Sequence, residues 1–209
     1  MDVLHNTVNG ELYGEKTDEE LVLETQKRGD VYALLIERYQ KRLERYIKRI
    51  SSFSEEDREE ILQETFIKAY KNLNGFDTSL KFSSWIYRIA HNETVSYARK
   101  IKAIPFSSFL TKNNEGKEEP ESLVEKIAAD IDTEREFDKK IIRDHIAEAL
   151  ETLDKKYRDV LILRFLEEKD YEEISDILQK PIGTVSVLIR RAKEKFKNIV
   201  VEKNIHKEL

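Results

Sequence analysis

Hydrophobic and polar residues alternate along most of this chain with a period of three to four positions, which is the spacing of amphipathic helices. In the first half, the pattern predicts helices over 17–50, with a break at Gly29-Asp30, and over 54–73 and 81–102. It is lost over 103–135, where prolines, asparagines and a glycine interrupt the spacing. In the second half, it predicts helices over 137–151, 155–166, 171–179 and 182–200. We therefore expect an all-α protein of two small helical domains joined by a flexible linker.

Short polar motifs mark the starts of several predicted helices. Thr17 is followed three positions later by Glu20, which is the spacing of a capping box. Asp170 and Glu173 repeat that spacing before the helix at 171–179. Ser54 stands where the helix at 54–73 begins, and serine is a favourable N-cap. These caps predict where three helices start.

The composition agrees with a helical fold and excludes several kinds of site. Charged residues make up 38% of the chain and hydrophobic residues 39%, with only 6 glycines and 3 prolines for turns. The absence of cysteine excludes disulfides and thiolate metal sites. The first twenty residues lack the blocks of a signal peptide, and no stretch approaches the roughly 20 apolar residues of a membrane span. We expect a cytoplasmic protein with no membrane contact of its own.

Charge is unevenly distributed along the chain. The formal net charge is -5, which by itself argues against a general nucleic-acid binder. The linker, 103–135, contains eight acidic and four basic residues, a net charge of -4. Its composition is typical of a solvated, partly disordered tether. The helical segments on either side therefore carry far less net charge than the total suggests.

The last two predicted helices have the spacing of a helix-turn-helix. On the helix at 182–200, an apolar stripe is formed by Ile182, Val185, Ile189, Ala192 and Phe196. The opposite face carries a row of polar and basic residues, with Val187 and Arg191 beside it: Ser186, Arg190, Lys193 and Lys197. A helix with such a face fits the major groove of DNA, where arginine can read guanine and valine can contact a thymine methyl. The other interpretation is an ordinary helical hairpin with solvated charges.

The helix at 81–102 combines aromatic and basic residues in an unusual density. Its apolar stripe is Phe82, Trp85, Ile86, Ile89 and Ala90. Arg88, Asn92 and Arg99 align along the flank of this stripe, and Ser96 lies on the same side. A stacking surface beside cations suits single-stranded DNA. Trp85 fits either the core, which is the favoured interpretation, or a platform for a base. Tyr87 and His91 lie well away from the stripe, so we expect both to be exposed.

The helix at 54–73 also carries apolar residues outside its expected core face. That face is formed by Leu62, Phe66, Ala69, Tyr70 and Leu73. Ile61 and Ile67 fall outside it, among Asp57, Glu60 and Glu64. Exposed apolar residues among acids often mark a protein interface, although single exposed isoleucines are also normal.

Three motifs in one order resemble the extracytoplasmic-function sigma factors of bacterial RNA polymerase, the two-domain type of the sigma-70 family. They are DREEILQETFIKAYKNLNGF, KFSSWIYRIAHN and, after a long linker, PIGTVSVLIRRAKEKF. The resemblance implies an extension at 1–16, a region 2 domain at 17–102, a linker at 103–135, a region 4 domain at 136–200 and a tail at 201–209. It also implies core RNA polymerase, promoter DNA and an anti-sigma factor as partners.

The resemblance assigns three sets of site residues. The region 2 domain is expected to melt the minus-ten element and hold a flipped base of the non-template strand, through Trp85, Tyr87, Arg88, His91, Asn92, Ser96 and Arg99, with the loop 74–80 as the other wall of the pocket. The region 4 domain is expected to read the minus-thirty-five duplex through Ser186, Val187, Arg190, Arg191, Lys193 and Lys197. Core polymerase is expected to bind Asp57, Glu60, Ile61, Gln63, Glu64 and Ile67. Asn92 has a second interpretation, a local hydrogen bond within its helix.

The sequence departs from the sigma-factor pattern at two places, and two other classes of protein were considered. Ser186 and Val187 stand where relatives often have polar or basic residues, and Gln179 replaces a small turn residue. An enzyme is not expected, because the four histidines are scattered and no phosphate loop, zinc motif or nucleophile elbow occurs. We expect no cofactor, metal or catalytic residue. A conventional helix-turn-helix regulator that binds duplex DNA without polymerase is the stronger rival.

Overall fold

The computed structural model describes residues 7–8, 11–12, 15–103, 149–150 and 152–202. These residues form two compact helical units, one N-terminal and one C-terminal. The prediction of two helical domains is confirmed. The linker 104–135, the start of the helix predicted at 137–151 and the end of the tail lie outside the described residues. Near the N-terminus, where no strand was predicted, β1 (Thr7–Val8) pairs antiparallel with β2 (Glu11–Leu12).

The first helices of the N-terminal unit begin and end where the sequence places them. α1 (Asp18–Lys27) has the predicted capping box: the Thr17 hydroxyl accepts from the Glu20 N–H, and the Glu20 carboxylate accepts from the Thr17 N–H. A 3-10 turn, η1 (Gly29–Val31), forms the predicted break before α2 (Tyr32–Ile50). The regular spacing of apolar residues in α2 buries one whole side of this helix.

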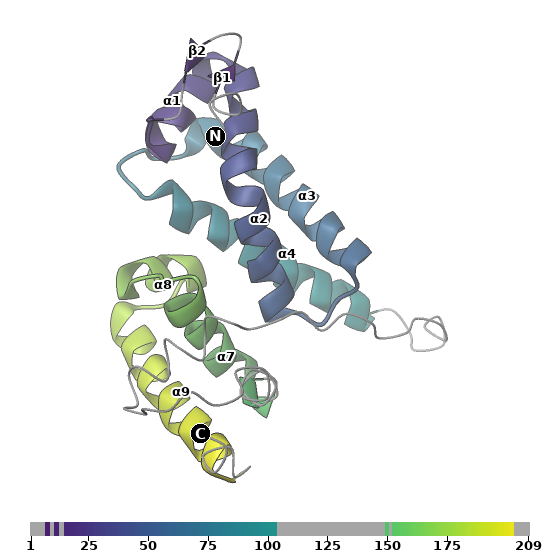
Figure 1. Cartoon of the computed structure of the whole chain (residues 1–209), viewed down its shortest axis with the longest axis vertical. Coiled ribbons are helices and arrows are strands. Elements are labelled where there is room, and N and C mark those ends of the chain that lie inside the picture. Colours follow the sequence, from purple (N-terminus) through teal and green to yellow (C-terminus); the bar gives the residue numbers. More distant parts are fainter. Residues whose placement is uncertain (1–6, 9–10, 13–14, 104–148, 151, 203–209) are drawn as a thin grey trace, which may run out of the picture. The chain divides into compact units, whose positions relative to one another are not determined.

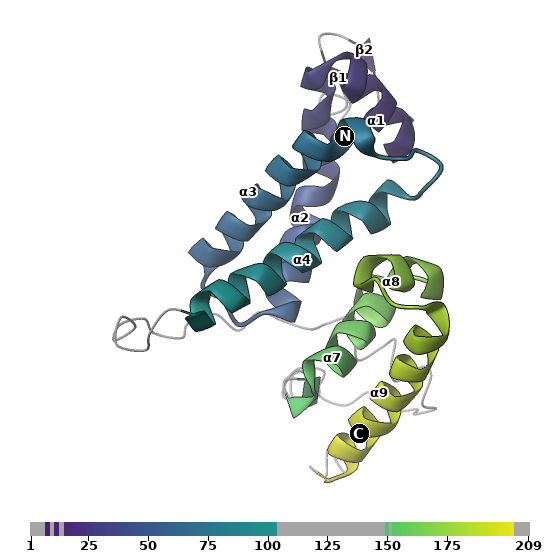
Figure 2. The same ribbon diagram turned by 180° about the vertical axis from the view of Figure 1, so that it is seen from behind.

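Three long helices make the body of this unit. α3 (Glu55–Asn72) starts at the predicted N-cap Ser54 and ends in a 3-10 turn, η2 (Leu73–Gly75). α4 (Phe82–Ala103) follows after the α3–α4 loop, residues 74–81. α2, α3 and α4 each pack on the other two, and α1 packs on α2 and α4 (Figures 1 and 2). The core lies where these helices meet, and its largest side chains are Tyr39, Tyr46, Tyr87, Phe82, Leu21, Leu35, Leu43, Ile47, Ile50 and Ile86.

Two predictions about the buried face of α3 are wrong. Ile61, expected outside the core, is only 2% exposed, and Tyr70, expected inside, is 51% exposed. α3 packs against both α2 and α4, so its buried arc is wider than one stripe and is turned toward Ile61. Tyr70 instead lies at the edge, with its ring centroid 5.0 Å from that of Tyr32. Its hydroxyl lies so close to Gly29 that a Cβ there would sit 2.8 Å away.

In the C-terminal unit, α7 (Lys155–Leu161) continues as a π-helical turn, η4 (Ile162–Leu166). α8 (Tyr171–Leu178) follows, and Asp170 and Glu173 form its predicted capping box. α9 (Ile182–Glu202) packs on α7. The buried residues of α9 are Val185, Ile189, Ala192 and Phe196, which confirms the predicted stripe except for Ile182. Ile182 is 48% exposed because it stands at the first residue of α9.

Two tight turns position the helix pair α8–α9. Before α8, Glu168 has a φ of 56° and Lys169 is buried, with its Nζ 3.0 Å from the Glu173 carboxylate. After α8, Gln179 takes the left-handed conformation, with a φ of 51°. Glycine is the residue that most readily adopts this C-terminal cap, so glutamine is strained there. Gln179 replaces a small turn residue in the sequence pattern, and the structure places it at this left-handed position.

Candidate functional site

A row of polar side chains runs along the exposed flank of α4. Arg88, Asn92, Ser96 and Arg99 follow one another at intervals of one helical turn. Asn92, Ser96 and Arg99 are exposed, and Arg88 is half-buried. Apolar packing on the opposite side of α4, through Phe82, Ile86 and Ala90, turns this flank outward. The row therefore presents an amide, a hydroxyl and the Arg99 guanidinium to solvent, with the half-buried Arg88 at one end.

Trp85 connects this row to the α3–α4 loop. It lies one turn before Arg88, it is half-buried, and its ring centroid is 5.0 Å from that of Phe76 in the loop and 5.7 Å from that of Phe82. Trp85 therefore packs on the core through its ring contacts and keeps part of its surface exposed. The loop and the polar flank meet at this side chain.

Two of the residues expected on this surface are buried instead. Tyr87 is fully buried, with its ring centroid 5.0 Å from that of Tyr46, and His91 is buried with its Nδ1 3.0 Å from the Tyr46 hydroxyl. The expectation that both are exposed is wrong. α4 packs against α2 and α3 together, so a second arc of the helix beside the apolar stripe is also covered. Neither side chain is open to DNA in this structure.

The α3–α4 loop has one buried anchor and an exposed remainder. Phe76 is buried, and its ring meets Phe82 edge-on at 5.8 Å. Beyond it, the Asp77 carboxylate accepts from the Ser79 N–H at 2.9 Å, and this hydrogen bond lowers the pKa of Asp77. Such a turn fixes the backbone locally without burying it. The exposed residues of the loop are Asn74, Gly75, Asp77, Ser79, Leu80 and Lys81.

The expected polymerase contacts on α3 divide into two groups. Glu60, Gln63 and Ile67 are exposed, and Glu64 is half-buried. Asp57 is engaged within the domain, because its carboxylate accepts from the Tyr97 hydroxyl of α4 at 2.7 Å. Burial, with this hydrogen bond as the second cause, raises the pKa of Tyr97. Together with the buried Ile61, this leaves Ile67 as the exposed apolar residue of the predicted set.

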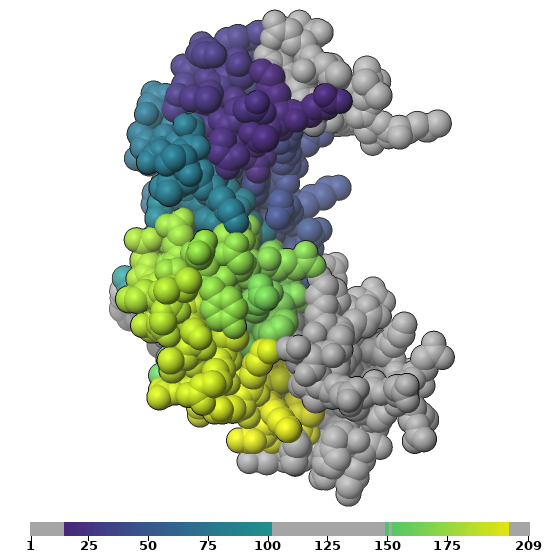
Figure 3. All heavy atoms as spheres, turned by 90° about the vertical axis from the view of Figure 1, so that its left-hand side faces the viewer, coloured from purple at the N-terminus to yellow at the C-terminus, as the bar shows by residue number. Residues whose placement is uncertain are grey.

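All six residues expected at the minus-thirty-five element are exposed on α9. These are Ser186, Val187, Arg190, Arg191, Lys193 and Lys197. The Arg190 guanidinium lies 3.0 Å from Glu194, but both side chains are more than half exposed, at 65% and 60%. An ion pair so open to water is weak and easily exchanged. Figure 3 shows the side chains of α9, drawn in yellow, open to solvent on the face in view.

Comparison with known proteins identifies the family of both units. The model of Sigma-70 region 2 matches residues 35–104, and the model of Sigma-70, region 4 matches residues 143–196. The ECF RNA polymerase sigma-E factor of Haemophilus influenzae is 30% identical over 192 residues, covering 88% of this chain and 96% of its own. This chain belongs to the extracytoplasmic-function sigma factors. It directs RNA polymerase to promoters and takes part in transcription initiation.

One further sequence relative and two solved structures of similar fold were found. The sigma factor SigW of Bacillus subtilis is 36% identical over 137 residues, covering 65% of this chain and 71% of its own. Among solved structures, CnrH in complex with the cytosolic domain of CnrY covers 88% of this chain and 97% of its own, at 19% identity and a TM-score of 0.62. The sigma factor RpoE of Bartonella quintana, in complex with the anti-sigma factor NepR, has a TM-score of 0.59 at 19% identity.

Two further kinds of feature were sought in the described residues. In the part of the chain that the structure describes, no cluster of three or more acidic or histidine side chains has the arrangement of a metal site. Within the same residues, no helix has the length and apolarity needed to cross a membrane. Family membership identifies a transcription initiation factor and not an enzyme.

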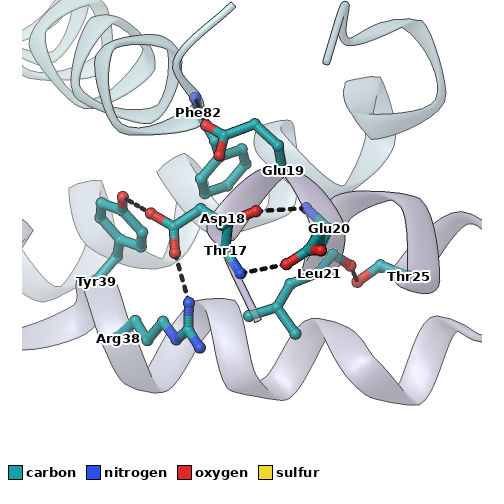
Figure 4. Close-up of polar contacts among 9 residues, drawn as sticks. All are labelled: Thr17, Asp18, Glu19, Glu20, Leu21, Thr25, Arg38, Tyr39 and Phe82. Atoms are coloured by element: carbon teal, nitrogen blue, oxygen red, sulfur yellow. Dashed lines mark hydrogen bonds and ion pairs between the residues drawn. The ribbon is translucent and has the colours of Figure 1, made fainter. Parts of the chain in front are cut away.

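Sequence reasoning missed two side chains that reach the α3–α4 loop. Glu19 and Gln26, both on α1, hydrogen-bond to the backbone at the two ends of this loop. Figure 4 shows Glu19 turned toward the Phe82 N–H at the start of α4. Both contacts join residues more than forty positions apart, so neither leaves a periodic signal. Acidic residues in the first turn of a helix are favourable because of the helix dipole, so Glu19 gave no sign of a further contact.

Proposed function

We propose that this sigma factor divides promoter recognition between its two helical domains. The N-terminal domain captures the melted non-template strand of the minus-ten element, and the C-terminal domain reads the minus-thirty-five element as duplex. The observation that carries the proposal is the arrangement around Trp85. An aromatic ring there joins a solvent-exposed loop to a row of amide, hydroxyl and guanidinium groups.

The chemistry of the α4 flank suits an unpaired strand. Aromatic rings stack on any unpaired base, and guanidinium groups attract the phosphates beside it. Asn92 offers two donors and an acceptor to the edge of a base that has left the stack. Asn92 is exposed and lies two helical turns after Trp85. We assign base reading to Asn92, and strand binding to Arg88, Ser96, Arg99 and Trp85.

The chemistry of α9 suits duplex DNA. A single helix fits the major groove, and its exposed face carries Arg190 and Arg191 where base edges or phosphates would lie. The buried stripe through Val185 and Ile189 fixes the rotation of α9, so that this face points outward. Val187 supplies an apolar contact and Ser186 a small polar one, and an exposed valine favours recognition of a thymine methyl in the bound sequence.

The exposed side of α3 is the proposed surface for core polymerase. Ile67 supplies an apolar contact, with Glu60, Gln63 and Glu64 around it. Asp57 orients the end of α4 through Tyr97 and is therefore assigned a supporting role. The domain boundaries proposed here are 17–102 and 136–200, with 103–135 as the acidic tether that follows the RNA path in the polymerase.

Regulation and location follow from the same assignment. Two structural neighbours are described as complexes, one with the cytosolic domain of CnrY and one with the anti-sigma factor NepR. Supported by this likeness of fold, we propose that an anti-sigma factor holds the present protein inactive until a signal releases it. Because the bacterial chromosome and polymerase share the cytoplasm, that compartment is the proposed site of action.

The test is transcription from a randomised promoter library by core polymerase, with and without this protein. The expected result is a set of transcripts whose promoters share two sequence elements and that require both proteins. Gel-shift binding to the selected promoters by the protein alone is the control. Tight duplex binding without polymerase, and no polymerase-dependent transcripts, would support a conventional helix-turn-helix regulator and overturn the proposal.

A further inference from the structure

α1 makes a polar contact with each end of the α3–α4 loop. The Gln26 amide donates from Nε2 to the Leu73 carbonyl at 3.0 Å, just before the loop. The Glu19 carboxylate accepts from the Phe82 N–H at 2.8 Å, just after it (Figure 4). The two contacts come from the two ends of one short helix. α1 itself precedes the residues, 35–104, that match the region 2 model.

α1 is firmly attached to the bundle. Its Asp18 carboxylate accepts from the Tyr39 hydroxyl and from Nη1 of Arg38, the latter at 2.9 Å, and both partners belong to α2 (Figure 4). Burial, followed by the hydrogen bond to Asp18, raises the pKa of Tyr39. Leu21 and Val22 of α1 are fully buried in the core. Contacts from this helix therefore hold the ends of the loop in a fixed place relative to the bundle.

Glu19 also acts on the start of α4. The first N–H groups of a helix have no partner within the helix and carry a partial positive charge. Caps usually come from the residue that precedes the helix, whereas this carboxylate comes from a helix sixty-three positions earlier in the chain. It fixes the point at which the loop ends and the polar flank of α4 begins.

We infer that α1 positions the α3–α4 loop for base capture, with Glu19 and Gln26 as positioning residues that do not touch DNA. The inference rests on the proposed role of the loop as one wall of the pocket. A loop that is exposed along most of its length has many conformations, and holding both ends in advance reduces the entropy lost when a base binds. Phe76 anchors the middle of the first half of the loop, and α1 anchors both ends.

The first test measures base preference. Wild type and Glu19→Ala/Gln26→Ala, each bound to core polymerase, are titrated with single-stranded minus-ten oligonucleotides that carry each base at each position. We expect the double variant to lose about tenfold in discrimination at one position, the scale of one or two hydrogen bonds. Binding of core polymerase and of the minus-thirty-five duplex stays unchanged.

Two matched variants separate positioning from general damage. Glu24→Ala removes an acidic side chain of α1 that contacts Lys16 and Lys27 and not the loop, so it keeps wild-type discrimination. Glu19→Gln keeps an oxygen that accepts from the Phe82 N–H, so it restores most of the discrimination lost in Glu19→Ala. Equal losses in Glu24→Ala and Glu19→Ala would overturn the inference.

A second measurement follows the loop itself. The chain has no cysteine, so Leu80→Cys provides one site for a nitroxide label at an exposed loop residue. The spectrum is expected to show faster label motion in the Glu19→Ala/Gln26→Ala background than in the Glu24→Ala background. Unchanged motion would show that α1 does not hold the loop, whatever the effect on the stability of the domain.

The proposed function and this inference fail in different ways. If Asn92→Ala relaxes base preference and Glu19→Ala/Gln26→Ala does not, the pocket stands and the positioning role of α1 is wrong. If neither variant changes base preference, the pocket assignment is wrong as well.

Discussion

The two candidate DNA surfaces are built in different ways. In the N-terminal domain, the loop, the α4 flank and α1 come from distant parts of the chain, and side-chain hydrogen bonds and ring contacts connect them. On α9, all six candidate residues lie on one helix and are exposed, and the buried stripe beneath them sets the rotation of that helix. An unstacked base needs a pocket with several walls, whereas a duplex groove needs only a straight helix. Tertiary contacts should therefore matter more to the first surface than to the second.

The largest effect is expected when both arginines of α9 are replaced, which tests whether this helix reads the duplex. If each makes a bidentate base contact, Arg190→Ala/Arg191→Ala should weaken binding to the minus-thirty-five duplex by about 2 to 6 kcal/mol, taking about 1 to 3 for each. Gel shifts with polymerase holoenzyme on the selected promoter measure this loss. Because both side chains are exposed, the thermal stability of the protein should not change.

Lys195→Ala is the control for this prediction. Lys195 is also an exposed cation of α9, but its Nζ lies 5.5 Å from the centroid of the Tyr157 ring within the same domain. Promoter-specific activity at the wild-type level in the double arginine variant would remove α9 from the recognition surface.

Replacing a buried residue of α4 should instead lower the stability of the N-terminal domain. Tyr87→Ala should lower the free energy of unfolding of the N-terminal domain by about 3 to 5 kcal/mol, because a fully buried aromatic ring leaves a cavity. Trp85 is the only tryptophan in the sequence, so its fluorescence during urea unfolding reports on this domain alone. Tyr70→Ala, at a half-exposed tyrosine, should cost much less. Equal costs for the two would contradict the observed packing of α4.

The free energy of unfolding of the C-terminal domain should depend on pH through the buried Asp159. Burial raises the pKa of Asp159 from 3.8 to about 6, so the folded state holds its proton more tightly than the unfolded chain does. The stabilisation is fully present below about pH 4 and is lost as pH rises through 6, at a cost of about 3 kcal/mol by pH 7. Asp159→Asn should remove this dependence. Hydrogen exchange of the α7 and α9 amides between pH 4 and 8 measures it; a flat profile in wild type would refute it.

The smallest and most specific effect is expected at Asn92. Asn92→Ala should reduce discrimination at one minus-ten position by about 1 to 3 kcal/mol and slow promoter opening, with folding and duplex binding unchanged. A pre-melted bubble should rescue opening only in part, because it supplies the unpairing energy and not the lost contact. Asn72→Ala is the control, since the Asn72 amide donates to the Lys68 carbonyl of its own helix. Unchanged base preference in Asn92→Ala would remove it from the pocket.

Local signals in the sequence predicted the helices well. Thr17, Ser54 and Asp170 all cap helices, and the Gly29-Asp30 break is a 3-10 turn. Each depends on residues within three or four positions, so the sequence contains the whole cause. The same holds for the exposed face of α9, because this helix has one main packing partner, α7, and one stripe predicts its buried side.

The packing of the three-helix bundle depended on the tertiary structure. Ile61, Tyr87 and His91 were misplaced because a helix between two neighbours buries two arcs, and the sequence of that helix alone does not show the second neighbour. Tyr70 was misplaced because the buried arc of α3 is turned toward Ile61. The contacts of Glu19 and Gln26 were invisible for a related reason, since a hydrogen bond across some fifty residues of chain has no spacing to detect. The sequence by itself determined the helices, their caps, the family and the row on α4. Only the tertiary structure decided which side chains of the bundle face solvent and which hold the loop, because burial and long-range hydrogen bonds depend on the neighbours of a helix.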